Sequence, residues 1–286
     1  MGKRKLCIAI PASVASDTPH LREKTSKIGL IGRAAAIFRV NEIIIYPDNP
    51  RVSQKVDMDL FAGLLAYMET PQYLRKSLFK LRPELQYAGI LPPLRAPHHP
   101  LNRKAKNLKV GEYREGVALS KTGEGTLVDI GVERPALARD IALLKGKRVT
   151  VKITRVGKLI EVELSDCDEI STYWGYTVTV EEHPFGSLLK KRGFNLVIAT
   201  SKYGSPFADV AEEVAEKWRT ANGVLVAFGA PTQGLSEIVK HEGLCLDNIV
   251  DFVVNTVPLQ GTETVRTEEA LIATLAILNM TVSDKG

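Results

Sequence analysis

The strongest constraint on the fold is a change of pattern along the chain: short apolar runs alternate with helical stretches at both ends, but not in the middle. Near the N-terminus, apolar runs at 6–10 and 42–46 flank a stretch with helical periodicity over 20–38. The C-terminal third alternates in the same way, with apolar runs at 195–200, 224–228 and 251–257. Continuous apolar strands that alternate with helices are typical of a parallel sheet covered on both faces, so we expect an α/β fold.

Capping residues indicate where several helices begin and end. A second N-terminal helix is expected from Asp57. In the C-terminal third, Ser205 is the expected N-cap of a helix that has Pro206 at its first position and ends near Gly223. A last helix is expected from about Thr267, where acidic residues suit the positive end of the helix dipole.

The middle of the chain changes to a period of two residues. Between Tyr113 and Val180, five short runs alternate apolar and polar residues: EGVALS, TLVDIGV, RVTVKITRV, LIEVELS and YWGYTVTV. Several short strands with little helix between them predict a small closed β-barrel, similar in size to an OB-fold.

These patterns divide the 286 residues into two domains. A discontinuous α/β domain is expected over 1–88 and 181–286, with an inserted barrel domain over 89–180. The barrel is entered through a basic, proline-rich stretch, residues 89–109. Two modules also agree with the length, since domains average roughly 150 residues.

The formal net charge of +5 is concentrated in two segments. Residues 1–40 hold eight Lys and Arg against two acidic residues, and residues 71–110 hold nine against one. Such clusters suit a polyanionic partner, because contacts to phosphates release counterions. Solvated helix faces and a linker are the alternative interpretation.

Several classes of protein are excluded. The longest apolar stretch, 270–278, is shorter than the roughly 20 residues that cross a bilayer, and the apolar core at 6–10 is too short for a secretory signal. Three cysteines lie far apart without a CxxC pair, which argues against disulfides and cysteine-bound zinc. His98 and His99 have no further metal-ligating residues at suitable spacing. We therefore expect a reduced, cytoplasmic protein with no metal.

The loops after the three C-terminal apolar runs are rich in small residues. They cover 200–204, 229–234 and 258–262. Ligands of open parallel sheets bind beyond the carboxyl ends of the strands, and glycine lets backbone amides approach a ligand closely. The loops could hold a flat heterocycle, or they could be ordinary tight turns. The sequence has neither a Walker A motif nor a dinucleotide-binding GxGxxG after a strand.

Long blocks in a fixed order resemble a known family. They are AIFRVNEIIIY (36–46), YLRKSLF (73–79), LQYAGILPPLRAPHH (85–99), REGVAL (114–119), YWGYTV (173–178) and NTVPLQGTETVRTEEALI (255–272). The chain resembles the SPOUT class of S-adenosylmethionine-dependent RNA methyltransferases, in the archaeal and eukaryotic branch that includes a human centromere-associated methyltransferase. The resemblance implies a C-terminal trefoil knot, a cofactor pocket made by the three loops, a homodimer with each active site near the partner subunit, and an OB-like insertion that helps to hold RNA.

Three local matches carry the resemblance further. Residues 27–33 are similar to an Asn-x-Gly-x-x-x-Arg motif, with Lys27 in place of the asparagine. Residues 228–234 match the adenosine-binding loop of the class. Residues 265–270 resemble the Leu-Arg-Thr-Glu-Thr-Ala of bacterial enzymes that methylate N3 of a uridine in small-subunit ribosomal RNA.

Individual residues then receive expected roles. Arg33 is expected to stabilise the negative charge of a uridine that loses its N3 proton, because arginine stays protonated and cannot be the base. Glu268 is expected as a catalytic base or a cofactor contact, with a plain first-turn carboxylate as the alternative. The expected cofactor contacts are Thr200, Ser201, Phe228, Gly229, Ala230, Gln233, Gly234, Asn255, Val257, Pro258, Leu259, Gly261, Thr262, Val265 and Thr267. The expected RNA contacts are Arg22, Lys27, Arg75, Lys76, Lys80, Arg82 and Arg266.

The expected activity is methylation of a uridine base, at N3, in large-subunit ribosomal RNA, with S-adenosylmethionine as the cofactor. Three alternatives stay open at this point: methylation of a ribose 2′-hydroxyl, an RNA-binding assembly factor without catalysis, and an α/β enzyme that acts on a small nucleotide.

Overall fold

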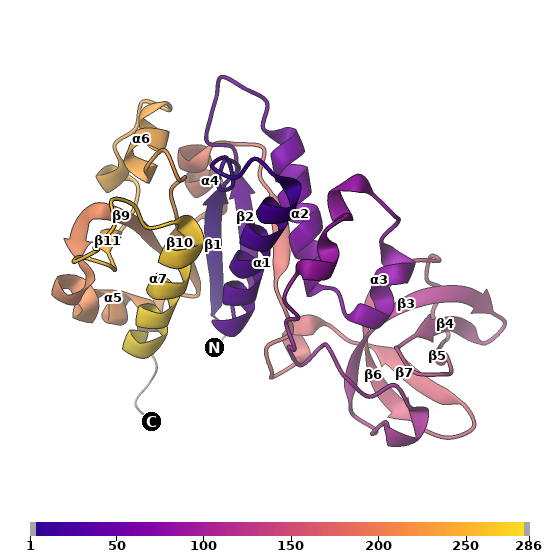
Figure 1. Ribbon diagram of the computed structural model, residues 1–286. Helices are drawn as coiled ribbons and strands as arrows, with labels where there is room; N and C mark the ends of the chain where they lie inside the picture. The colour runs from indigo at the N-terminus through magenta and orange to yellow at the C-terminus, as the bar shows by residue number, and fades with distance from the viewer. Residues whose placement is uncertain (1–3, 283–286) are drawn as a thin grey trace. The chain divides into compact units, whose positions relative to one another are not determined.

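The computed structural model describes residues 4–282, and the chain divides into two compact units (Figure 1). One unit combines the residues up to Ala66 with Glu84–Pro92 and those from Tyr176 onward. The other combines Tyr67–Pro83 with Pro93–Gly175. The boundaries of independently folding domains stay a prediction from the sequence.

The first unit is built on one parallel sheet. Within the described residues its strands follow the order β11-β9-β10-β1-β2-β8, and every neighbouring pair is parallel. Their bounds are β1 Lys5–Pro11, β2 Glu42–Tyr46, β8 Thr177–Val180, β9 Leu196–Pro206, β10 Gly223–Ala227 and β11 Phe252–Asn255. Side chains from both faces of the central strands are buried, among them Ile8, Ala9 and Ile44. The predicted α/β fold with a parallel sheet is confirmed.

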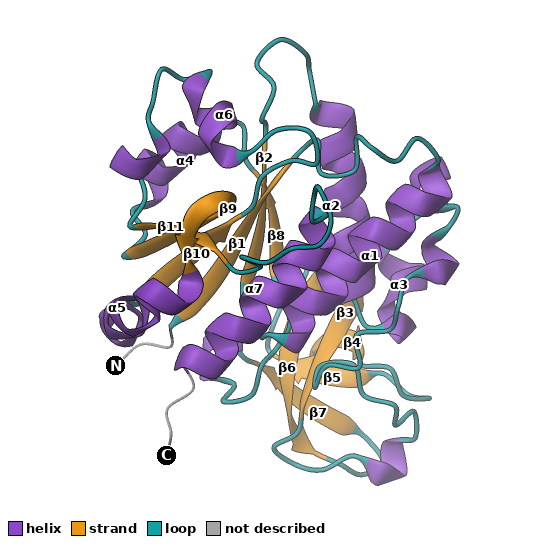
Figure 2. Cartoon of the chain, turned by 60° about the vertical axis from the view of Figure 1, so that its left-hand side comes forward, coloured by secondary structure: helices purple, strands orange, loops and turns teal. Residues whose placement is uncertain are grey.

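Helices cover both faces of this sheet (Figure 2). On one face, α4 and α6 contribute Phe185, Leu188 and Ile238 to a core that also contains Ala9 and Tyr46. On the other face, α7 packs against α1 and α5. The helix bounds along the chain are α1 Leu21–Ile37, α2 Lys55–Glu69, α3 Gln72–Leu78, α4 Phe185–Arg192, α5 Phe207–Thr220, α6 Leu235–Lys240 and α7 Thr267–Val282. The helices predicted at 20–38, from Asp57 and from Thr267 are confirmed.

The second unit contains a closed barrel of five strands, in the order β3-β4-β5-β7-β6. The strands are β3 Tyr113–Thr122, β4 Gly125–Asp129, β5 Ala136–Arg139, β6 Arg148–Arg155 and β7 Ile160–Leu164. Small and β-branched side chains fill the interior, including Ala118, Val128 and Ile153. The closed barrel agrees with the prediction from the sequence.

Two local predictions are wrong. The run YWGYTVTV is not the fifth barrel strand: its last four residues form β8, which pairs with β2 in the parallel sheet, and β5 takes its place in the barrel. A two-residue period does not specify which sheet a strand joins. Ser205 does not cap α5, because it belongs to β9 and pairs with Val254; the N-cap is Pro206.

A buried ion-pair network joins the end of α2 to the barrel within the second unit. Arg148 donates from Nη1 to Glu69 Oε2 at 2.6 Å and from Nε to Glu115 Oε2 at 2.7 Å. His98 Nε2 lies 3.0 Å from Glu69 Oε1. Burial acts to raise the pKa of the Glu69 carboxyl, but hydrogen bonds from His98 and Arg148 outweigh it and lower this pKa to about 2.

Candidate functional site

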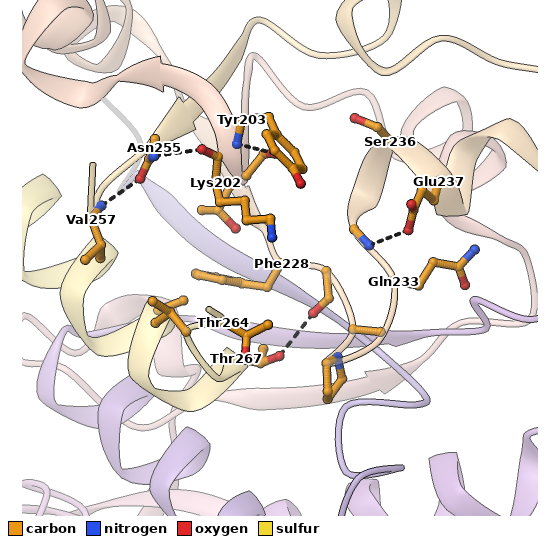
Figure 3. Close-up of a pocket in the computed structure, with 18 of the residues that line it drawn as sticks. Lys202, Tyr203, Phe228, Gln233, Ser236, Glu237, Asn255, Val257, Thr264 and Thr267 are labelled. Carbon is orange, nitrogen blue, oxygen red and sulfur yellow. Dashed lines mark hydrogen bonds between the residues drawn. The ribbon is translucent and has the colours of Figure 1, made fainter. Parts of the chain in front are cut away.

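A cavity of about 480 Å³ opens at the carboxyl ends of β9, β10 and β11 (Figure 3). Its size lies within the range of roughly 300–1,000 Å³ that is typical of small-molecule sites. Its wall combines apolar side chains, hydroxyl groups and main chain. The lining residues are Thr200–Tyr203, Phe228–Gly234, Ser236, Glu237, Lys240, Val254–Val257, Gln260, Thr264, Val265, Thr267 and Ala270.

The first wall of the cavity is a bulge in β9 rather than a loop after it. β11 pairs with β9 up to Ala199 and again from Ser205, so residues 200–204 are left out of the ladder. A Cβ atom on Gly204 would lie 2.7 Å from the carbonyl oxygen of Val253, so only glycine fits there without a shift of the backbone. The bulge therefore lies tightly against β11 and directs its side chains toward the cavity.

The second wall is the turn that follows β10. Tyr46 Oη donates a hydrogen bond of 2.9 Å to the carbonyl of Phe228, and Ala230 N donates one of 2.8 Å to the carbonyl of Gln233. A Cβ on Gly229 would lie 3.1 Å from that same Gln233 oxygen. A hydrogen bond therefore closes the turn, and a side chain at Gly229 would crowd the backbone of the turn itself.

The third wall is cross-linked to the other two. Asn255 Oδ1 accepts from Val257 N, and Asn255 Nδ2 donates to the carbonyl of Lys202, both at 2.9 Å. Thr267 Oγ1 donates to the carbonyl of Gly229 at 3.1 Å. Hydrogen bonds therefore hold the three walls together before any ligand binds, which lowers the ordering cost of binding.

Most residues expected in the cofactor pocket line this one cavity. They are Thr200, Ser201, Phe228, Gly229, Ala230, Gln233, Gly234, Asn255, Val257, Val265 and Thr267. Pro258, Leu259, Gly261 and Thr262 do not line it. Gln260 Nε2 donates to the carbonyls of Thr262 and Glu263, so this loop folds onto itself and leaves Leu259 95% exposed.

Several side chains that line the cavity and can carry charge or donate hydrogen bonds were not predicted from the sequence. Lys202 and Tyr203 belong to residues 200–204, the first of the three predicted loops, and have the largest side chains in it. Ser236, Glu237 and Lys240 come from α6, a six-residue helix that the periodicity did not reveal. Glu237 Oε2 accepts from Gly234 N at 3.2 Å and so stabilises the start of α6.

The two expected catalytic residues lie outside the cavity lining. Glu268 is buried, and its carboxylate lies 3.5 Å from the ammonium of Lys27. Lys27 is itself buried, with a second contact of 2.8 Å to Asp17. Lys27 was expected to contact RNA, but in this arrangement its ammonium is enclosed by two carboxylates. Arg33 is half-buried on α1.

The other expected RNA contacts fall into two groups. Lys76, Lys80 and Arg82 are exposed in the second unit, and Arg22 and Arg266 are exposed in the first. Arg75 differs from its neighbours in the chain, since its guanidinium donates to the carbonyls of two residues at the end of α2. Its hydrogen bonds indicate a structural role as a helix cap.

Two further observations concern the described part of the chain. Among residues 4–282, no helix is both long and apolar enough to cross a membrane, and no group of three or more metal-ligating side chains comes together. A second cavity, of about 680 Å³, contains Asp48, Glu181 and Glu242 in its lining, but none of the residues expected to bind the cofactor.

The chain is similar to known proteins over nearly its whole length. Residues 5–278 match a family model described as "Putative RNA methyltransferase". A 28S rRNA (uridine-N(3))-methyltransferase of Mus musculus is 33% identical over 98% of this chain and 77% of its own length. The protein of the same name in Homo sapiens is 32% identical over 96% of this chain and 77% of its own. An uncharacterized protein of Haloarcula marismortui is 33% identical over 96% of this chain and 98% of its own. The chain belongs to this family of RNA methyltransferases, and it is an enzyme of that class.

Proposed function

We propose that this enzyme transfers a methyl group from S-adenosylmethionine to N3 of a uridine in large-subunit ribosomal RNA. The names of the mouse and human relatives support both the base and the type of RNA. The observation that carries the proposal is the cavity at the carboxyl ends of β9, β10 and β11, which unites eleven residues expected to contact the cofactor.

The lining fits the chemistry of this cofactor. Val257 and Val265 offer apolar surface for an adenine ring, and the turn from Gly229 to Gly234 offers main-chain groups for its polar edge. The hydroxyls of Thr200 and Thr267 are already oriented by bonds to the carbonyls of Ala227 and Gly229. When bound, the cofactor supplies an electrophilic methyl group on its sulfonium. The chain's part is then to align this methyl group with the target nitrogen.

A homodimer forms part of the proposal. α1 and α7 pack together, and both expose apolar side chains: Leu30, Ile37, Ile272 and Met280 are each more than 40% exposed. A second copy of the chain would cover this face. Arg33 lies between Leu30 and Ile37 at helical spacing, on the same side of α1. In such a dimer Arg33 serves the active site of the partner subunit, which explains why it lies outside the cavity lining of its own chain.

The remaining elements of the proposal follow from the family resemblance and from charge. The C-terminal part of the chain forms a trefoil knot around the cofactor cavity, and the barrel assists RNA binding. Lys76, Lys80 and Arg82 contact phosphates, as their exposure and their charge allow. The protein acts in the cytoplasm.

The test is to incubate the enzyme with methyl-labelled S-adenosylmethionine and unmodified large-subunit ribosomal RNA, and to identify the labelled nucleoside by mass spectrometry. N3-methyluridine is the expected product. A nucleoside labelled on its ribose would show that the enzyme methylates a 2′-hydroxyl instead of N3. Unlabelled RNA would show that large-subunit ribosomal RNA is not the substrate.

A further inference from the structure

Two neighbouring side chains at the mouth of the cavity differ from the rest of its wall. Tyr203 is 86% exposed, although it lines the cavity and belongs to a strand. The ammonium of Lys202 lies 5.0 Å from the centre of the Tyr203 ring. Figure 3 shows the Lys202 side chain reaching into the cavity toward Phe228. Within the described residues, no carboxylate forms an ion pair with Lys202.

The backbone that carries this pair is held in place on both sides. The carbonyl of Lys202 accepts from Asn255 Nδ2 at 2.9 Å, and the amide of Tyr203 donates to Ser201 Oγ at 3.2 Å. Gly204 lies in direct backbone contact with β11. A bulge that places an exposed aromatic ring and a cation beside a site is an arrangement suited to ligand contact, because rigid support reduces the entropy lost on binding.

We infer that Lys202 and Tyr203 form the binding site for the target base, in which Tyr203 stacks on the uracil ring and Lys202 favours the anion formed at N3. This inference rests on the proposed function. Unpaired RNA bases stack on exposed aromatic side chains, and each such contact contributes about 1–3 kcal/mol. A positive charge within a few ångströms of an acid favours its ionised form.

The chemistry of N3 explains why a cation is useful there. The nitrogen of neutral uridine carries a proton, and its lone pair is delocalised into two carbonyl groups. The proton leaves to solvent, and the negative charge then spreads over N3 and both carbonyl oxygens, where an ammonium stabilises it. The N3 electron pair forms the new N–C bond while the S–C bond breaks and its electrons stay on sulfur. Lys202 neither gains nor loses a proton in this scheme.

The test measures kcat/KM for methylation of unmodified large-subunit ribosomal RNA between pH 6.5 and 9, together with the Kd of S-adenosylmethionine from calorimetry. The variants are Lys202→Gln, Lys202→Arg and Tyr203→Leu, with Lys190→Gln on α4 as the reference for loss of one exposed positive charge. Since one pKa unit of the substrate changes its ionised fraction tenfold, Lys202→Gln should lose about tenfold or more in kcat/KM at pH 7 relative to Lys190→Gln.

The pH profile distinguishes the inferred role from others. The defect of Lys202→Gln should narrow as the pH rises, Lys202→Arg should restore most of the rate at pH 7, and Tyr203→Leu should raise KM for RNA. The Kd of S-adenosylmethionine should stay within about twofold in all variants. A rate defect of Lys202→Gln that does not change with pH would overturn the inference. A loss of cofactor affinity that matches the loss of rate would also overturn it, since Lys202 would then bind the carboxylate of the cofactor. Absence of N3-methyluridine with the unmutated enzyme would instead remove the proposed function.

Discussion

The hydroxyl of Thr267 donates a hydrogen bond of 3.1 Å to the carbonyl of Gly229 and thereby joins the first residue of α7 to the turn after β10. The two residues are 38 positions apart in the chain, yet both line the cavity. The contact fixes two walls of the site relative to each other without help from a ligand.

Replacing Thr267 with valine removes the hydrogen bond and keeps the shape of the side chain. Because a hydrogen bond of this kind contributes about 0.5–1.5 kcal/mol, we expect S-adenosylmethionine to bind roughly three- to tenfold more weakly to Thr267→Val. Calorimetry measures the change, with Thr267→Ser as the control that keeps the hydroxyl. Equal affinity for the valine variant and the unmutated protein would show that this bond does not organise the pocket.

Gly229→Ala should disturb the turn directly. The added Cβ would approach the backbone of Gln233, Gly234 and Leu235 to within 3.1–3.2 Å, so the turn must move. We expect about 1–3 kcal/mol less stability and a weaker cofactor complex. Gly261→Ala is the matched control, since a Cβ there meets nothing within 4 Å. Equal cofactor affinity of the two alanine variants would show that the shape of the turn at Gly229 does not control binding.

The carboxylate of Glu69 should make the second unit sensitive to acid. Its pKa lies at about 2 in the folded protein, against a usual value of 4.5, so its contribution is fully present above pH 4.5 and is lost as the pH falls toward 2. Glu69→Gln should lower the free energy of unfolding at pH 6 by about 3 kcal/mol and reduce the difference between pH 6 and pH 3. Urea denaturation at both pH values measures this.

The control for this prediction is Glu163→Gln on β7, whose carboxylate is 55% exposed and lies 3.6 Å from Lys152. Surface pairs of this kind contribute at most about 1 kcal/mol. If Glu69→Gln and Glu163→Gln lose the same small amount of stability at pH 6, the buried network does not stabilise the second unit.

A shared active site can be tested by mixing two inactive variants. A chain with Arg33→Ala should no longer supply a positive charge to the active site of the partner subunit. A chain with Gly229→Trp should have a blocked cofactor cavity but an intact Arg33. Random pairing of the two chains gives mixed dimers that keep one complete site, so about a quarter of the unmutated activity should return. Co-purification of differently tagged chains verifies that mixed dimers form. Mixed dimers without activity would show that Arg33 acts within its own chain or not at all.

Neutralising Lys76, Lys80 and Arg82 together should weaken RNA binding and reduce its dependence on salt. Each phosphate contact to single-stranded RNA contributes about 0.7 to the slope of log affinity against log salt concentration, so the slope should fall by about 2. Arg75→Gln serves as the contrast, because loss of its bonds to the end of α2 should lower stability rather than the salt slope. An unchanged salt slope in the triple variant would show that these three side chains do not contact the RNA phosphates.

The sequence predicted the architecture well because burial on both faces of a parallel strand leaves a continuous apolar run. The strands at 6–10 and 42–46 are found where this pattern predicts them. β5 was not predicted, and β8 was predicted in the barrel, since both are four-residue strands whose partners depend on contacts far away in the chain.

The site was predicted in part for a similar reason. Residues such as Gly229 and Thr267 stand in recognisable motifs, and the structure brings them together. Lys202 and Tyr203 were not singled out, because their position depends on a bulge in β9 that exists only through its pairing with β11. Lys27 was expected to contact RNA, and a helical period does not reveal that Asp17 and Glu268 enclose its ammonium.

A crystal structure with S-adenosylhomocysteine would determine whether the ends of β9, β10 and β11 form the cofactor site. We expect adenine density beside Val257 and the turn at Gly229, with the amino-acid part of the molecule in the same cavity. Density for the ligand in the second cavity, beside Asp48 and Glu181, would contradict it.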